Sequence, residues 1–202
     1  MPKVLAIASS PRKGGNSELL LDASLEGARE TGAEIEKIRV CELKVSPCLN
    51  CGACQETGEC VIHDDMQLLH RKFVENEILI VSSPVFFMGL PAQLKAVVDR
   101  CQAIWVRKYL LKLRMPNFDS RRALFIQVGG MKPTTVFEGG LKTITAFFAT
   151  LDYKFHSRLL LNDIDAKGAV CSHPTALGEA RRLGLEIVNS VPSEQSKTDR
   201  RA

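Results

Sequence analysis

Five short segments with the character of β-strands alternate with stretches of helical periodicity along the whole chain. They are residues 3–9, 34–40, 78–83, 122–128 and 152–161. Several are runs of aliphatic side chains, as expected of strands buried on both faces, whereas 34–40 alternates charged with apolar residues and has one wetter face. Strands that alternate with helices predict an α/β fold with a doubly wound parallel sheet covered by helices on both faces. Five such strands suit the order 2-1-3-4-5.

Helices are expected between these strands, and their start and stop signals are clear in most places. The expected helices begin at Ser17, at Asp64-Asp65, near Pro91, at Gly139 and at Thr175. Residues 105–120 show no clear pattern and are treated as an excursion. We expect residues 1–191 to form a single domain that includes the loop 48–60, and residues 192–202, which are polar, to form a flexible C-terminal tail.

Composition narrows the class of protein. The chain has 202 residues, a net charge of +4 and 45% hydrophobic residues, which is ordinary for a globular domain. No apolar run approaches the ~20 residues that span a bilayer, and the N-terminal segment is too short for a signal peptide, so we expect a cytoplasmic protein without a membrane partner. The basic residues are scattered, which argues against nucleic acid as a partner.

The loop at residues 9–17, Ser-Ser-Pro-Arg-Lys-Gly-Gly-Asn-Ser, joins the first strand to the first helix. Ligands of doubly wound sheets bind outside the carboxyl ends of the strands, where this loop lies. A helix N-terminus offers free N–H groups to an anion, and Arg12 can pair with a phosphate. The loop is neither a Walker motif nor G-x-G-x-x-G. An ordinary turn with Asn16 or Ser17 as helix cap is the alternative.

The loops after the third and fourth strands have a different character. Residues 82–91 place apolar side chains in a loop at the ligand edge, which a flat aromatic ligand would explain. A loop folded into local core, or a subunit interface, would explain them as well. Gly129 and Gly130 follow the fourth strand and allow the backbone to approach a ring edge, although they also suit a plain turn.

The two larger loops together resemble one protein family. Ser-Pro-Arg-x-x-Gly-Asn-Ser, followed by Ser-Pro-Val-Phe-Phe-x-Gly-x-Pro-Ala-x-Leu-Lys-x-x-x-Asp-Arg, is similar to the NAD(P)H-dependent FMN reductases of the flavodoxin-like fold. The resemblance implies bound FMN. It implies that the phosphate is held by the first loop, the ribityl chain and isoalloxazine by the second, and the ring edge by the glycines: Ser9, Pro11, Arg12, Asn16, Ser17; Pro84, Val85, Phe86, Phe87, Met88; Gly129, Gly130. Ser9 stands where relatives often have Gly, and Phe86 where they often have Tyr.

Four of the seven cysteines, Cys48, Cys51, Cys54 and Cys60, lie in one loop. Thiolates are soft ligands that select iron–sulfur clusters or zinc, and two-residue spacings allow them to wrap a compact cluster. The motif resembles that of the iron–sulfur flavoproteins, a branch of the same family, which implies a [4Fe–4S] cluster on these four residues. Zinc, and redox disulfides or free thiols, remain alternatives. The other three cysteines are expected to be small buried hydrophobes.

The resulting hypothesis is a redox enzyme. FMN would exchange electrons with the cluster, with a donor such as ferredoxin and a quinone or a reduced oxygen species as acceptor. No catalytic side-chain acid or base is required, and the resemblance implies a homodimer or homotetramer. One alternative is an NAD(P)H-dependent FMN or quinone reductase without a cluster. Another is a non-enzymatic flavin electron carrier or thiol redox sensor.

Overall fold

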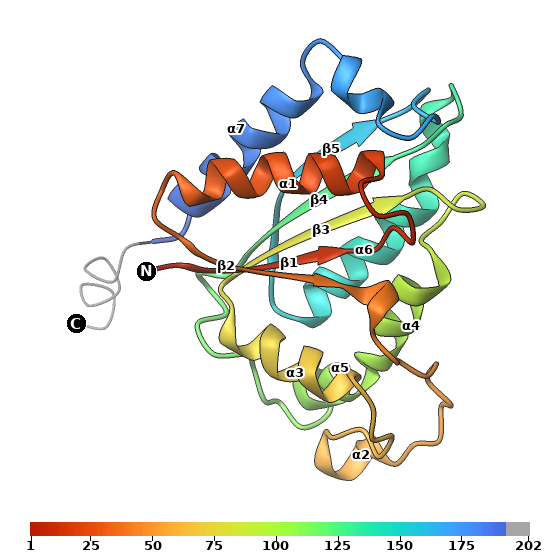
Figure 1. The fold of residues 1–202 in the computed structure, drawn as a ribbon. Helices are drawn as coiled ribbons and strands as arrows, with labels where there is room; N and C mark the ends of the chain where they lie inside the picture. The colour runs from red at the N-terminus through yellow and green to blue at the C-terminus, as the bar shows by residue number, and fades with distance from the viewer. Residues whose placement is uncertain (193–202) are drawn as a thin grey trace.

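A five-stranded parallel sheet forms the centre of the molecule (Figure 1). The computed structural model describes residues 1–192. The strands occur in the order β2-β1-β3-β4-β5 and all four neighbouring pairs are parallel, which confirms the predicted fold. Their bounds are β1 (Lys3–Ala8), β2 (Glu34–Arg39), β3 (Ile78–Pro84), β4 (Arg122–Val128) and β5 (Lys154–Leu161).

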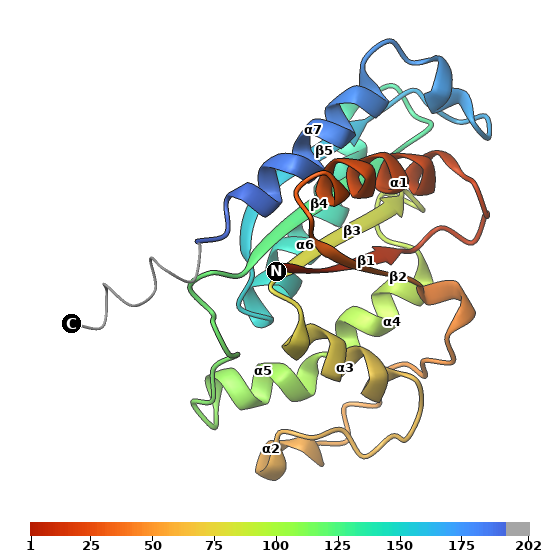
Figure 2. The ribbon, with the colours of Figure 1, turned by 60° about the vertical axis from the view of Figure 1, so that its left-hand side comes forward.

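Helices cover both faces of the sheet (Figure 2). Strand β1 shows why, because Val4 and Ala6 enter one core while Leu5 and Ile7 enter the other, and all four are buried. The first core lies under α1 (Asn16–Arg29) and α7 (Ala176–Asn189). The second lies under α3 (Met66–Glu75), α4 (Ala92–Arg100), α5 (Gln102–Tyr109) and α6 (Glu138–Thr150).

The excursion predicted at residues 105–120 is partly helical, because α5 extends to Tyr109. Ala103, Ile104 and Val106 turn inward, but α5 has only 8 residues and its Trp105 is partly exposed, so the periodic signal is short. Shorter elements also lie in the loops: α2 (Cys54–Thr57) and the 3₁₀ turns η1 (Val40–Glu42), η2 (Thr134–Phe137) and η3 (Ala169–Ser172).

The predicted tail and the predicted single domain are only partly covered by the structure. Of the predicted tail, residues 193–202 lie outside the described part of the chain, and the single-domain assignment stays a prediction. Within residues 1–192, none of the helices is both long and apolar enough to cross a membrane.

Helices α1 and α7 approach each other closely because glycine stands at the crossing on both of them. A Cβ atom on Gly184 would lie 1.8 Å from the carbonyl oxygen of Ser24, and one on Gly27 would lie 1.9 Å from that of Arg181. These neighbours are backbone atoms, so a substitution must move a whole helix. The contact therefore fixes where α1 lies over the sheet.

We predict that Gly184→Ala lowers the free energy of unfolding by about 1–3 kcal/mol through overpacking. Gly178 lies on the same helix with nothing within 4 Å of its Cβ position, so Gly178→Ala is the matched control. It should leave the protein as stable or up to about 1 kcal/mol more stable, because Ala is the better helix former. Urea unfolding of both variants checks this, and equal stabilities would contradict the packing account.

Candidate functional site

A cavity opens at the carboxyl edge of the sheet, bordered by the loops that follow β1, β3, β4 and β5. Seven of the twelve residues predicted to bind the cofactor line it, from three separate loops: Arg12, Asn16, Ser17, Pro84, Val85, Phe86 and Gly130. The structure thus brings together one polar loop and one apolar loop that are about 70 residues apart in the sequence.

The N-terminus of α1 faces this cavity without a side-chain cap. Gly15 is the N-cap residue, and none of the described side chains makes a capping hydrogen bond to it. The first N–H groups of a helix carry a partial positive charge and need an acceptor. Arg12 lines the cavity beside them, whereas the Lys13 ammonium turns to Glu42 at 2.9 Å. This arrangement of donors fits an anion.

The loop 10–15 is held in shape by Glu18. The N–H of Gly14, a residue with φ +63°, donates to Glu18 Oε2 at 2.8 Å, and Arg39 and Lys37 form ion pairs with the same carboxylate. Burial alone would raise the pKa of Glu18, but these hydrogen bonds outweigh it and lower the pKa to about 2. The carboxylate therefore supports the loop while its own charge is neutralised.

Two of the predicted phosphate ligands use their side chains within the protein. Ser9 is fully buried and donates its hydroxyl to the Ser82 carbonyl at 2.8 Å, so it lies outside the lining. Asn16 lines the cavity, but its amide donates to the Ala166 carbonyl at 2.8 Å and accepts from the N–H of Val170 at 3.2 Å. Both side chains support the cavity wall. Pro11 does not line the cavity either.

The tip of the apolar loop projects away from the cavity. Phe86 and Gly89 exchange backbone hydrogen bonds of 3.1 and 2.9 Å, and Phe87 and Met88 between them have φ of 46° and 63°. Positive φ at both central residues is the geometry of a type I′ turn, which leaves their side chains exposed. Phe87 and Met88 therefore lie outside the lining.

The pair of glycines after β4 is divided between two roles. Gly130 lines the cavity, whereas Gly129 lies outside the lining and donates its N–H to the Leu161 carbonyl at 2.9 Å. The N–H of Ile164 donates to the Gly129 carbonyl at 3.1 Å, which ties the loop after β5 to the end of β4.

The sequence interpretation missed the loop after β5, which contributes Ile164, Asp165 and Lys167 to the lining. Asp165 packs on Gly130, where a Cβ atom would come within 3.0 Å of it. A signal was available, because in the order 2-1-3-4-5 the fifth strand lies beside the fourth and ends at the same edge. These residues add one negative and one positive side chain to the site.

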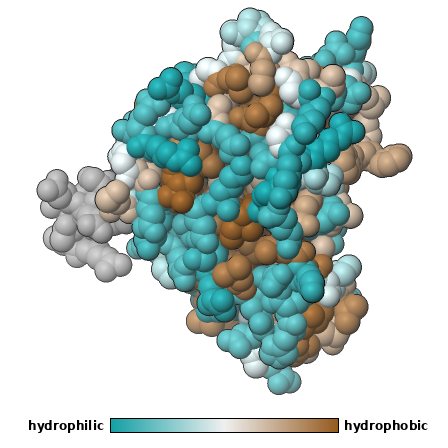
Figure 3. Space-filling model, viewed as in Figure 1, coloured by the Kyte–Doolittle hydropathy of each residue, from teal (hydrophilic) through white to brown (hydrophobic). Residues whose placement is uncertain are grey.

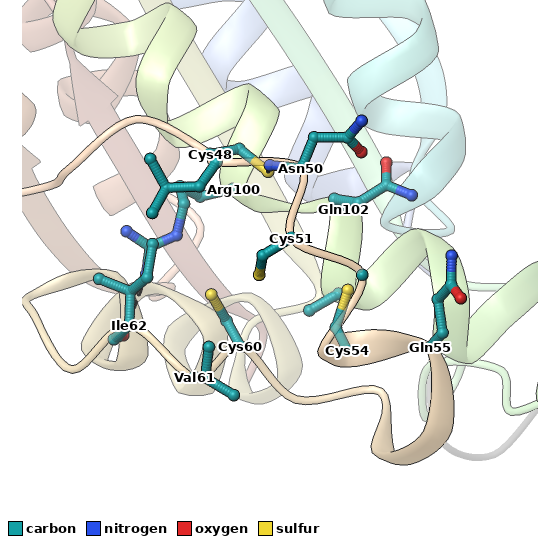
Figure 4. A pocket seen from close by; sticks show the side chains of 13 residues that line it. Cys48, Asn50, Cys51, Cys54, Gln55, Cys60, Val61, Ile62, Arg100 and Gln102 are labelled. Carbon is teal, nitrogen blue, oxygen red and sulfur yellow. Dashed lines mark hydrogen bonds between the residues drawn. The ribbon is translucent and has the colours of Figure 1, made fainter.

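A second cavity contains all four thiols of the loop 48–60 (Figure 4). Cys51, Cys54 and Cys60 face a common space with Cys48 at its edge. Burial raises the pKa of Cys54, and the charges of the other three thiolates act in the same direction. Within residues 1–192, no three His, Cys, Asp or Glu side chains are grouped so that they could hold a metal ion. The four thiols line one cavity without converging on one point.

A buried ion pair anchors this loop at both ends. The Arg100 side chain is inaccessible to solvent, and it donates to the Ser46 carbonyl at 2.9 Å, to the Ile62 carbonyl at 3.1 Å and to Asp64 at 2.7 Å. Burial alone would raise the pKa of Asp64, but hydrogen bonds from Arg100 and from the N–H groups of Ser46 and Met66 outweigh it and lower the pKa to about 2. Asp64 also accepts from the N–H of Met66 at 3.0 Å, so the expected helix start and the anchor coincide.

The remaining three cysteines differ from one another. Cys101 is buried, as expected, and burial raises the pKa of its thiol strongly. Cys41 is half-buried and donates to the Ser9 carbonyl at 3.4 Å, and Cys171 is exposed, so the expectation of small buried hydrophobes was wrong for these two.

We predict that Glu18 stabilises the protein in a pH-dependent manner. Its folded pKa of about 2 lies below the ordinary value of 4.5, so its contribution is fully present above pH 4.5 and is lost as the pH falls toward 2. Glu18→Gln should unfold more easily at pH 7, by up to about 3 kcal/mol, and the difference from wild type should shrink between pH 4.5 and 2. Urea titrations across this range measure it; a constant difference would contradict the assignment.

The fold and the first cavity define a flavodoxin-like protein in which the uncapped N-terminus of α1 and the loop before it line a cavity at the sheet edge. Residues 2–152 match the family model described as NADPH-dependent FMN reductase. An iron–sulfur flavoprotein of Methanosarcina thermophila is 31% identical over 190 residues, which cover 94% of this chain and 91% of that protein. One of Methanocaldococcus jannaschii is 39% identical over 201 residues, covering 94% and 97%. The chain therefore belongs to the iron–sulfur flavoprotein branch of the NADPH-dependent FMN reductase family.

Solved structures agree on the fold. The NAD(P)H:quinone oxidoreductase of Methanothermobacter marburgensis superposes with a TM-score of 0.71 at 19% identity, covering 91% of this chain and 98% of the other. The family match makes the protein an FMN-dependent oxidoreductase, as predicted.

Proposed function

We propose that this protein transfers electrons between FMN in the first cavity and a [4Fe–4S] cluster held by Cys48, Cys51, Cys54 and Cys60. The observation that supports it best is that four thiols line one cavity in a chain of the iron–sulfur flavoprotein branch. The proposal treats residues 1–191 as one functional domain, and a cytoplasmic location would suit its seven free cysteines.

The residues of the first cavity fit FMN. The uncapped N-terminus of α1 and the Arg12 guanidinium would hold the phosphate, with Ser10 and Ser17 in the same wall. The apolar wall from Pro84 to Phe86 would cover a ring face, and Gly130 would meet its edge. FMN supplies the exchange of both single electrons and hydride. The chain contributes binding and orientation, with no side-chain acid or base.

The residues of the second cavity fit a cluster. A cubane takes one thiolate on each of its four irons, so its ligands must lie around one space. All four thiols line one cavity, with Cys51, Cys54 and Cys60 facing the common space and Cys48 at its edge. Arg100 belongs to the same lining, and its buried Nε has no hydrogen-bond partner among the described residues. The sulfur atoms of a bound cluster accept hydrogen bonds from N–H groups of this kind. A bound cluster supplies one-electron transfer.

The partners belong to the proposal as well. We expect a protein donor such as ferredoxin, or NAD(P)H, and a quinone or an oxygen species as acceptor. A homodimer or homotetramer would cover apolar surface that now faces solvent. Phe87 is fully exposed at the tip of the first cavity's loop, and Leu49 and Val61 are exposed beside the cysteines. Hydrophobic surface is visible near α2 at the lower end of the molecule (Figure 3).

The alternative with a specific observation behind it is an NAD(P)H-dependent FMN or quinone reductase without a cluster. The matching family model is described as NADPH-dependent FMN reductase, an activity that needs no cluster. Rapid turnover of NAD(P)H by iron-free protein would favour this alternative. Slow turnover together with reversible oxidation of the exposed Cys51 would favour a thiol redox sensor.

We predict that Arg12→Ala weakens FMN binding by about 10- to 100-fold, the value of one charge-assisted hydrogen bond to phosphate. Lys13→Ala is the matched control, because its ammonium is paired with Glu42 outside the cavity. The affinity for FMN is measured by titrating FMN with apoprotein and following the quenching of flavin fluorescence. Riboflavin, which lacks the phosphate, should bind both variants equally. An equal loss of FMN affinity in both variants would contradict the phosphate assignment.

We predict that Cys54→Ala removes most of the iron and acid-labile sulfide while FMN content is retained. Cys171 is exposed and distant in sequence from the loop, so Cys171→Ala should keep the full iron content. Both variants are purified without oxygen, and their iron, sulfide and flavin are assayed. Wild-type iron content in Cys54→Ala would exclude this residue as a ligand.

A further inference from the structure

Arg100 has more donors than its structural partners use. Its two terminal nitrogens donate to the Ser46 and Ile62 carbonyls and to both oxygens of Asp64, which accounts for the loop anchor. Its Nε is buried and has no hydrogen-bond partner in the described part of the chain. A buried N–H without an acceptor costs free energy, so this group calls for an acceptor that the protein itself does not supply.

The cysteine cavity is where that acceptor belongs. Arg100 lines the cavity together with all four thiols, and Figure 4 shows it on the side where Ile62 lies. The Ser46 and Ile62 carbonyls that Arg100 binds each lie two residues from a thiol of this cavity, Cys48 and Cys60.

We propose that Arg100 Nε donates a hydrogen bond to sulfur of the cysteine-bound cluster and thereby raises the cluster's reduction potential. This inference rests on the proposed function. It makes Arg100 a positioning and tuning residue that acts on the cluster from outside its ligand set.

The direction of the change in the cluster's reduction potential follows from charge. Reduction adds one electron to the cluster, and that negative charge is shared by its sulfur atoms. A donor N–H directed at sulfur stabilises the reduced form more than the oxidised form, and hydrogen bonds to sulfur are among the factors that set such potentials. The formal charge of Arg100 is balanced by Asp64, so the directed N–H is the local contribution.

A test must separate this hydrogen bond from the ion pair. Asp64→Asn combined with Arg100→Gln keeps the pair neutral and places the Gln side-chain amide nitrogen at the position of Nε, because the two side chains have the same number of atoms up to that point. Asp64→Asn combined with Arg100→Met is also neutral and places a methyl group there. The two double variants differ in the N–H donor.

The measurement is the midpoint potential of the cluster, followed by EPR during a redox titration, with the flavin absorbance as an internal control. The Met variant should be reduced less favourably than the Gln variant by about tenfold in the equilibrium constant, which corresponds to about 59 mV for one electron. The flavin midpoint should be equal in both. Equal cluster midpoints would overturn the inference and leave the proposed function intact. Wild-type protein without iron and sulfide would overturn both.

A second test uses wild-type protein and therefore does not require that the double variants fold. Protein labelled with ¹⁵N at the arginine Nε position should show a ¹⁵N hyperfine coupling to the reduced cluster in pulsed EPR. Arg100 is the arginine that lines the cysteine cavity. Absence of this coupling in a reduced, cluster-containing sample would overturn the hydrogen bond.

Discussion

The parallel direction of all five strands is the constraint on which the rest of the structure depends. Parallel strands end at one edge, so the loops that follow them meet there although they are far apart in the sequence. The cavity formed at this edge combines the uncapped N-terminus of α1 with the apolar residues after β3. The glycine contact between α1 and α7 sets the position of that helix. The position of the uncapped α1 N-terminus in the cavity is thus a direct consequence of helix packing.

Helix α4 connects this edge to the cysteine cavity. It begins at Ala92, directly after the apolar loop, and it ends at Arg100, which lines the second cavity. Its 9 residues span about 13 Å. Arg100 holds both ends of the cysteine loop through backbone carbonyls and Asp64, so the thiols are positioned by the same scaffold that positions the first cavity. A change in α4 would therefore affect both sites.

The strands and most of the helices could be predicted because burial on one or two faces leaves a periodic pattern in the sequence. Helix α5 escaped detection, since eight residues give little periodicity and its outward face carries Trp105 and Tyr109. For the candidate site, sequence motifs predict which loops form it, but they do not predict where each side chain points. Asn16 and Ser9 have the expected residue types, yet their polar groups bond to neighbouring backbone, and this depends on contacts between residues 73 to 154 positions apart.

The role of Arg100 could not be predicted for a similar reason. It forms an ion pair with a residue 36 positions away, and its burial depends on how α4 packs under the loop 46–62. Lys167 and Asp165 enter the first cavity only because β5 lies beside β4. Such contacts are set by the tertiary structure and leave no local pattern.

The most direct test of the account is the content of iron, acid-labile sulfide and flavin in protein purified without oxygen. The account predicts about four iron and four sulfide for each FMN, as one cubane on four thiolates requires. Flavin without iron or sulfide, even after anaerobic reconstitution, would contradict the cluster and favour a reductase that works with flavin alone.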